Sequence, residues 1–224
     1  MQKLFHYVKF IPLEAVDERK NALTLVPREG VFAALLAVKY VIENDIKGDI
    51  VECGVWRGGM SILMAGMLKL HGSSKKVYLY DTFCGMTAPG AKDGFVGQEP
   101  EVNDLIKHGS SLTDVKMYFE NVDLLNDNLV FVEGDVMESL AVHENLPNKI
   151  ALLRLDTDMY ESTKCEMEFL FPLLSHAGVL IVDDYGSMGW IGSRSAVDEY
   201  FGKNGKRPFF SYIDRNARIG IKSI

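Results

Sequence analysis

Four aspartates stand at the ends of two apolar segments, with residue types and spacing that suit a catalytic site. The stretch LRLDTDMYEST places Asp156 and Asp158 directly after IALLRL, and Asp183 and Asp184 follow VLIV. Carboxylates are costly to bury without a partner, and an all-oxygen set of ligands suits Mg²⁺ better than zinc. We expect Asp156, Asp183 and Asp184 to bind Mg²⁺. If the backbone is still extended, Asp158 projects with Asp156 and is placed to take a proton from a hydroxyl beside the metal.

Three further acids, Glu52, Asp81 and Asp135, follow other apolar segments. Any one of them could be a helix cap. If the segments are parallel strands of one sheet, however, their carboxyl ends share one edge, where like charges need a cation or a hydrogen-bonding ligand. Asp81 is then placed to accept both ribose hydroxyls of an adenosine cofactor. Asp135 lies on the side of the adenine ring, with a cap for the turn at 136–141 as an equal alternative.

The turn VECGVWRGG, after the first of these segments, is of the nucleotide-binding type. Its glycines allow a ligand to approach the backbone, and the helix that follows offers its N-terminus. The spacing of Gly54, Gly58 and Gly59 fits the dinucleotide pattern G-x-G-x-x-G poorly, because Trp56 stands where that pattern has glycine. By itself the turn is a weak signal.

The elements that must position these residues alternate along the chain. We expect helices at 14–45, 60–70, 111–125, 160–175 and 190–201, and strands at 49–53, 76–81, 128–135, 148–156 and 177–185. A closing pair of strands, PFFSYI and ARIGIK, is separated only by DRNA. Long crossovers imply a parallel sheet, and the short link implies an antiparallel hairpin. The fold class is therefore a doubly wound α/β sheet with an antiparallel C-terminal strand.

Residues 82–100 contain four glycines and two prolines, so we expect them to form a long loop, of a length usually kept for function. The rest of the composition excludes several classes of protein. The net charge of −7 without a basic cluster disfavours nucleic acid as a partner. No apolar run has the length of a membrane span, and the first residues lack a signal-peptide pattern, so we expect a cytoplasmic protein. The three cysteines form no CxxC pair.

Five segments together resemble the macrocin O-methyltransferase (TylF-type) family: VECGVWRGG, YDTFCGM, VEGDVMESL, LRLDTDMYEST and IVDDYG. They occur in the family's order and at its approximate spacing. The run LDTDMYEST with a downstream VDDY is much more specific than the glycine turn. Members of this family depend on S-adenosylmethionine (SAM) and Mg²⁺, and they methylate sugar hydroxyls on macrolide and aminocoumarin antibiotics.

The resemblance implies a class I methyltransferase domain with a Rossmann-like sheet at residues 46–224. A helical extension at 1–45 would cover the cofactor and build an oligomer contact, giving a dimer or a tetramer, and the loop at 84–100 would be a lid. The implied partner is a small glycosyl or vicinal-diol acceptor.

Carried onto this chain, the resemblance makes Asp158 the general base and gives Mg²⁺ to Asp156, Asp183 and Asp184. Asp81 would hold the ribose of SAM. The complete set of implied cofactor contacts is Glu52, Gly54, Trp56, Arg57, Gly58, Ser61, Asp81, Thr82, Asp135, Val136, Ser139 and Asp156.

Three alternatives stay open at this point. A catechol-type methyltransferase also uses Mg²⁺ at these strand ends, but that family carries a lysine three residues after its first aspartate, where this chain has Met159. An NAD-dependent oxidoreductase is weakened by Trp56 and leaves the acidic cluster unexplained. A sugar- or nucleotide-binding protein without catalytic activity is the third.

Overall fold

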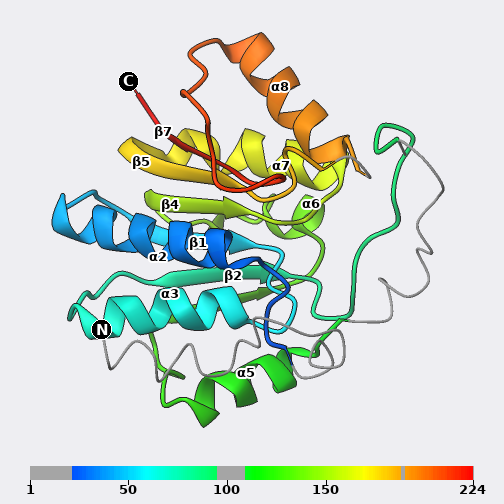
Figure 1. Cartoon of the computed structure of the whole chain (residues 1–224). Helices are drawn as coiled ribbons and strands as arrows, with labels where there is room; N and C mark the ends of the chain where they lie inside the picture. Colours follow the sequence, from blue (N-terminus) through cyan, green and yellow to red (C-terminus); the bar gives the residue numbers. More distant parts are fainter. Residues whose placement is uncertain (1–21, 95–108, 188–189, 224) are drawn as a thin grey trace.

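The computed structural model describes residues 22–94, 109–187 and 190–223. In these residues seven strands form one sheet in the order β3-β2-β1-β4-β5-β7-β6 (Figure 1). Strands β1 to β5 run parallel, and β7 is antiparallel to both β5 and β6. The strands are β1 (Asp49–Cys53), β2 (Val77–Asp81), β3 (Leu129–Glu133), β4 (Ile150–Leu155), β5 (Leu174–Val182), β6 (Ser211–Tyr212) and β7 (Arg218–Ile221).

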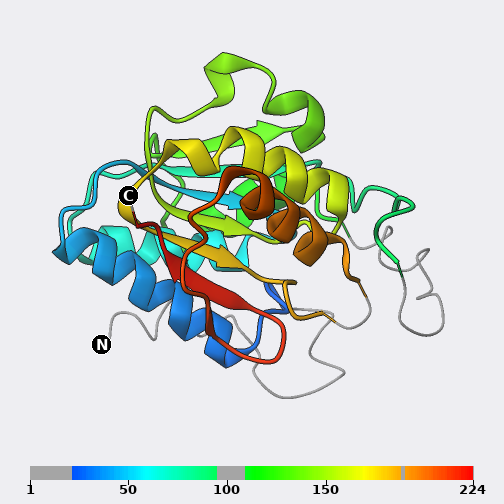
Figure 2. The same ribbon diagram turned by 90° about the horizontal axis from the view of Figure 1, so that it is seen from above.

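Helices cover both faces of the sheet, as Figures 1 and 2 show. One core cluster joins the sheet to α2 (Arg28–Glu43), α3 (Gly59–Leu70) and α5 (Leu112–Asn121). The second cluster joins the opposite face to α6 (Val136–Ser139), α7 (Tyr160–Phe169) and α8 (Gly192–Asn204). Because β1 and β4 are covered on both faces, nearly all of their residues are buried, and most are apolar apart from the buried charged residues Glu52 and Arg154. The predicted fold class is confirmed.

The N-terminal helix is shorter than the sequence pattern predicted. Of the expected helix at 14–45, residues 14–21 lie outside the described part, and 22–27 are not helical. Pro27 takes the N-cap position of α2, which is consistent with the proline's restriction of the residue before it. The helix buries Val31, Leu35 and Val38 in the same core as the sheet. The described part of residues 1–45 therefore packs as part of the main body, while the predicted domain boundary stays a prediction.

Several other boundaries also differ from the expectation. The helix expected at 160–175 ends at Phe169, and a short 3-10 turn at Phe171–Leu173 holds Pro172. Strand β5 then begins at once, because Leu174 already pairs with Ile150. Helix α5 starts where predicted, with the Ser111 hydroxyl accepting from the Asp114 amide, but it ends at Asn121 rather than at 125.

Within the described residues, no helix is long and apolar enough to cross a membrane. The loop after β2 is irregular over 82–94, as predicted, and the remainder of the expected lid lies outside the described part.

Candidate active site

The acids predicted to bind a metal meet at the carboxyl ends of β4 and β5. These strands are neighbours in register, with Leu155 opposite Val182, and the Asp183 amide donates to the Leu155 carbonyl over 2.9 Å. One carboxylate oxygen from each of Asp156, Asp183 and Asp184 lies within 4.8 Å of the others. The structure therefore brings the three predicted ligands together at one point of the sheet edge.

A buried arginine lies behind this cluster, and the sequence analysis did not single it out. Arg154 on β4 is 1% exposed and binds three carboxylates. Its guanidinium donates to Glu52 over 2.8 Å, to Asp156 over 2.7 Å and to Asp183 over 2.7 Å. The signal was present in the sequence. Arg154 is the register partner of Glu52 and stands two residues before Asp156, so the parallel pairing of β1 with β4 puts the three on one face.

The single charge of Arg154 does not neutralise the four aspartates of the cluster, and their raised pKa values show it. Burial raises the pKa of Asp156 to about 6 and that of Asp183 to about 7, although Arg154 lowers both. Burial and the neighbouring Asp158 raise the pKa of Asp184. The Asp184 Oδ2 atom is buried and has no hydrogen-bond partner among the described groups. A divalent cation would supply the missing positive charge, so the donor set fits Mg²⁺.

Asp158 does not continue the strand, contrary to the condition on which the sequence argument placed it. Strand β4 ends at Leu155, and Asp158 adopts a left-handed conformation with φ of +64°. Its carboxyl group forms a hydrogen bond with Asp184, and burial raises its pKa. The turn, rather than strand alternation, therefore brings Asp158 to the cluster.

A second buried acid, Glu166, contacts this turn through Thr157. Glu166 on α7 is fully buried and accepts a hydrogen bond from the Thr157 hydroxyl over 2.9 Å. Burial raises the pKa of Glu166 to about 8, so the group is mostly protonated at neutral pH. It therefore holds Thr157, between Asp156 and Asp158, without adding a full charge to the site.

The predicted cofactor turn lies against the cluster of aspartates. Gly54 has φ of +82°, and a Cβ there would stand 1.9 Å from the Asp156 carbonyl oxygen. Only glycine allows this approach of the β1 turn to the end of β4. Gly58, with φ of +81°, is the N-cap of α3, and Leu23 lies across the turn because its carbonyl accepts from the Gly59 amide over 2.9 Å. The turn after β1, the N-terminus of α3 and the residues before α2 therefore lie together beside the acids.

Asp81 connects the turn after β1 with the start of the loop after β2. Its Oδ2 accepts from the amides of Val55 at 2.6 Å and Trp56 at 2.9 Å, and its Oδ1 accepts from the Phe83 amide at 2.8 Å. Ribose hydroxyls would have to share these lone pairs or displace a backbone donor. The Thr82 hydroxyl lies close by and donates to the Gly85 carbonyl over 2.5 Å.

The other predicted cofactor contacts fall into two groups. In the first group, Glu52 and Ser61 are buried behind the turn and hydrogen-bonded to each other. The Arg57 guanidinium of the same group donates to the Ala22 carbonyl over 3.0 Å and lies 4.6 Å from the centre of the Trp56 ring.

The second group follows β3. Asp135 caps α6 by accepting from the Met137 amide over 2.9 Å, so its alternative role is present in the structure. Val136 and Ser139 are buried in α6, and the Ser139 hydroxyl has no partner among the described groups. The contacts of all these residues with a cofactor stay predictions.

With this geometry in view, comparison with known proteins identifies the family. The profile of macrocin-O-methyltransferase (TylF) matches residues 12–218. The chain belongs to the macrocin-O-methyltransferase family. The resemblance drawn from the five sequence segments is thereby confirmed, and with it the assignment of the chain as an O-methyltransferase.

Two proteins similar to this chain come from Streptomyces. The 8-demethyl-8-(2,3-dimethoxy-alpha-L-rhamnosyl)-tetracenomycin-C 4'-O-methyltransferase of Streptomyces olivaceus is 36% identical over 79% of this chain and 67% of its own. Demethyldecarbamoylnovobiocin O-methyltransferase of Streptomyces niveus is 36% identical over 91% of this chain and 77% of its own. Among solved structures, the O-methyltransferase NovP superposes with a TM-score of 0.82 at 32% identity, covering 91% of this chain and 83% of its own.

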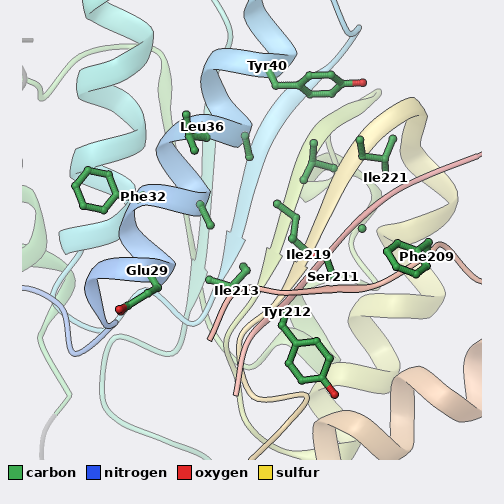
Figure 3. A pocket seen from close by; sticks show the side chains of 14 residues that line it. Glu29, Phe32, Leu36, Tyr40, Phe209, Ser211, Tyr212, Ile213, Ile219 and Ile221 are labelled. Atoms are coloured by element: carbon green, nitrogen blue, oxygen red, sulfur yellow. The ribbon is translucent and has the colours of Figure 1, made fainter. Parts of the chain in front are cut away.

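This TylF-family chain also has a groove away from the aspartates. A hollow of about 700 Å³ runs between α2 and the β6–β7 hairpin (Figure 3). Its wall is mostly apolar, with Phe32, Leu36 and Phe209 among the exposed side chains, and Glu29 is the single charged residue among the described residues that line it. None of the clustered aspartates is among the residues that line it, so the groove is separate from the acidic cluster.

The acidic cluster makes a first prediction about pH. The folded-state pKa values of Asp156, Asp158 and Asp183 lie at about 6, 8 and 7, all above the ordinary aspartate value. Groups with raised folded-state pKa values stabilise the folded state at low pH and lose that contribution as the pH rises through them. Without divalent cations, the free energy of unfolding should therefore fall between pH 5 and pH 8. Thermal melts across this range measure it.

Added Mg²⁺ should raise the melting temperature more at pH 8 than at pH 5, because protons compete with the cation for the same oxygens. Equal effects of Mg²⁺ at the two pH values would contradict a cation site built from these acids.

Proposed function

We propose that this enzyme transfers the methyl group of SAM to a hydroxyl of a sugar in a glycosylated small molecule, with Mg²⁺ held by Asp156, Asp183 and Asp184. One observation carries the proposal. The three carboxylates lie within 4.8 Å of one another, directly beside the glycine turn that a cofactor would occupy. An acceptor hydroxyl beside these carboxylates and a methyl donor at the turn would thus meet between the ends of β1 and β4.

The residues of the chain divide the work between them. When bound, SAM supplies an electrophilic methyl group and Mg²⁺ acidifies the hydroxyl that it chelates. Asp158 takes the proton of that hydroxyl as oxygen forms the new bond to carbon and the carbon–sulfur bond breaks. Without a cation, burial and the neighbouring Asp156 and Asp183 raise the pKa of Asp158 to about 8, so its carboxyl group is largely protonated at neutral pH. A cation on Asp156 and Asp183 would lower that pKa and leave a carboxylate that can accept the proton. The Gly54 turn and Asp156 hold the two reactants close together, and such positioning supplies much of the acceleration in a displacement of this kind.

The acceptor class follows from the chemistry and from the relatives. Two adjacent oxygens suit a cation that keeps open positions beside three carboxylates. The relatives from Streptomyces olivaceus and Streptomyces niveus are named for tetracenomycin and novobiocin methylation. A mycinamicin III 3''-O-methyltransferase of Micromonospora griseorubida is 30% identical over 80% of this chain and 70% of its own. We propose a glycosyl or vicinal-diol acceptor and a homo-oligomeric enzyme.

The test combines binding with turnover. Calorimetry should detect binding of SAM and S-adenosylhomocysteine (SAH), and no binding of NAD⁺. Transfer of a labelled methyl group should then be measured on methyl α-L-rhamnopyranoside, larger rhamnosides and catechol, with and without Mg²⁺. We expect transfer to a glycoside that EDTA abolishes and Mg²⁺ restores.

Each alternative has its own outcome in this experiment. Preference for catechol would reassign the acceptor, and unchanged rates in EDTA would remove the metal from the scheme. Binding of NAD⁺ in place of SAM would overturn the proposed reaction altogether.

A further inference from the structure

The loop after β2 is fastened to the far side of the site through a single buried aspartate. Asp93 is 1% exposed although it belongs to an irregular loop. Its Oδ1 accepts from the Tyr160 amide and its Oδ2 from the Gly90 amide, both over 2.6 Å. Its carbonyl accepts from the Ile191 amide over 3.1 Å. One residue thus connects the loop with α7 and with the segment that enters α8.

The contact with Tyr160 is a helix cap supplied from elsewhere in the chain. Tyr160 is the first residue of α7, and Met159 at the N-cap position makes no capping bond of its own. The Asp93 carboxylate takes that place, where the first amides and the helix dipole favour a negative charge. Figure 1 shows the loop leaving the carboxyl edge of the sheet at β2 and rising toward the start of α8.

The neighbouring residue reinforces the attachment. The Lys92 ammonium group donates to the Tyr160 hydroxyl over 2.7 Å and lies 4.0 Å from the centre of its ring. The Tyr160 hydroxyl in turn donates to Glu199 on α8 over 2.6 Å. Two successive loop residues, Lys92 and Asp93, therefore bind the same tyrosine.

The Asp93 carboxylate packs directly against Gly192 at the start of α8. A Cβ at Gly192 would stand 1.9 Å from Asp93 Oδ1 and 2.6 Å from the Tyr160 amide nitrogen. Glycine is therefore required at the start of α8 for this contact to form.

These contacts bracket Asp158. On one side the Tyr160 amide, two residues on, is held by Asp93. On the other side the Asp158 carbonyl accepts from the Ser193 amide over 3.2 Å, at the start of α8, which Asp93 also binds. Because Asp158 sits in a left-handed turn rather than in a strand, its position depends on these flanking contacts.

We propose that Asp93 is a positioning residue for Asp158, acting through the Tyr160 amide and the start of α8. The inference rests on the proposed function for its link to turnover, but the anchoring itself can be measured without any acceptor. Asp93→Ala removes both acceptors, and Asp93→Asn keeps one. Gly192→Ala keeps the Asp93 side chain unchanged but forces its carboxylate away from the Tyr160 amide. Asp127→Ala, at an exposed aspartate in the turn before β3, is the matched control.

Amide hydrogen exchange at residues 157–160 is the first readout. Loss of one buried hydrogen bond should speed exchange there about tenfold in Asp93→Ala and in Gly192→Ala, with a smaller effect in Asp93→Asn. Exchange in β1 to β3 and the affinity for SAH should stay within about twofold of the parent. Unchanged exchange at 157–160 would overturn the anchor, and equal loosening throughout the sheet would reduce Asp93 to a general stability residue.

Turnover on methyl α-L-rhamnopyranoside is the second readout. We expect kcat to fall about tenfold in Asp93→Ala and Gly192→Ala with the KM for SAM unchanged, while Asp127→Ala behaves as the parent. Faster exchange with unchanged kcat would overturn the positioning role. If the parent enzyme methylates none of the probes, the proposed function fails, and exchange at 157–160 alone supports or overturns the anchoring of the Asp158 turn.

Discussion

Asp158→Asn is expected to lower methyl transfer by about 100- to 10,000-fold, the range over which a general base contributes. The amide cannot take the proton that leaves the acceptor hydroxyl. The Gly54 turn and Asp81 are untouched, so the affinity for SAH should stay within about twofold. Single-turnover methyl transfer and calorimetry with SAH separate the two effects.

The backbone at this position makes asparagine the appropriate replacement. Asp158 has φ of +64°, a conformation that asparagine tolerates and that most other residues adopt only with strain. Asp123→Asn is a matched control, because Asp123 has φ of +56° and lies on the surface beside Lys69, far along the chain from the cluster. The control should leave both SAH affinity and turnover unchanged. Full activity in Asp158→Asn would show that another group takes the proton.

The sequence was sufficient for the arrangement of the sheet and for the gathering of its acids. Asp156, Asp183 and Asp184 follow runs such as IALLRL that can only be buried strands, and parallel strands bring their carboxyl ends to one edge. Placing the three aspartates at one edge requires only that the segments are strands and that these strands run parallel. It does not depend on the exact ends of the helices, which is why the errors at α2 and α7 left it intact.

Contacts between distant segments could not be predicted in the same way. Asp93 caps a helix 67 positions away, and nothing in the loop sequence specifies that partner. The left-handed turn at Asp158 is likewise fixed by its flanking contacts, so strand periodicity does not apply to Asp158, although its side chain still reaches the acidic cluster. Arg154 differs from both, because its pairing with Glu52 follows from strand register and could have been inferred from the sequence.

Arg154→Met is expected to lower the free energy of unfolding by about 3–5 kcal/mol at pH 8, the usual cost of leaving buried charges without their partner. The guanidinium is 1% exposed and donates to Glu52, Asp156 and Asp183. Methionine fills much of the same volume, so the loss measures charge rather than packing. Denaturant unfolding checks it. Arg194→Met is the control, since Arg194 is 61% exposed at 3.6 Å from Asp198 and should change stability by less than about 0.5 kcal/mol.

The deficit of Arg154→Met should shrink as the pH falls from 8 to 5. Arg154 lowers the pKa values of Asp156 and Asp183, which nevertheless lie at about 6 and 7, so without the arginine both rise further. The folded variant then takes up protons that its unfolded chain does not bind, and acid stabilises it relative to the parent. Mg²⁺ should also recover part of the loss at pH 8, because a cation on the same carboxylates replaces the missing charge. A variant within 1 kcal/mol of the parent at pH 8, or one equally destabilised at pH 5, would show that Arg154 does not balance these acids.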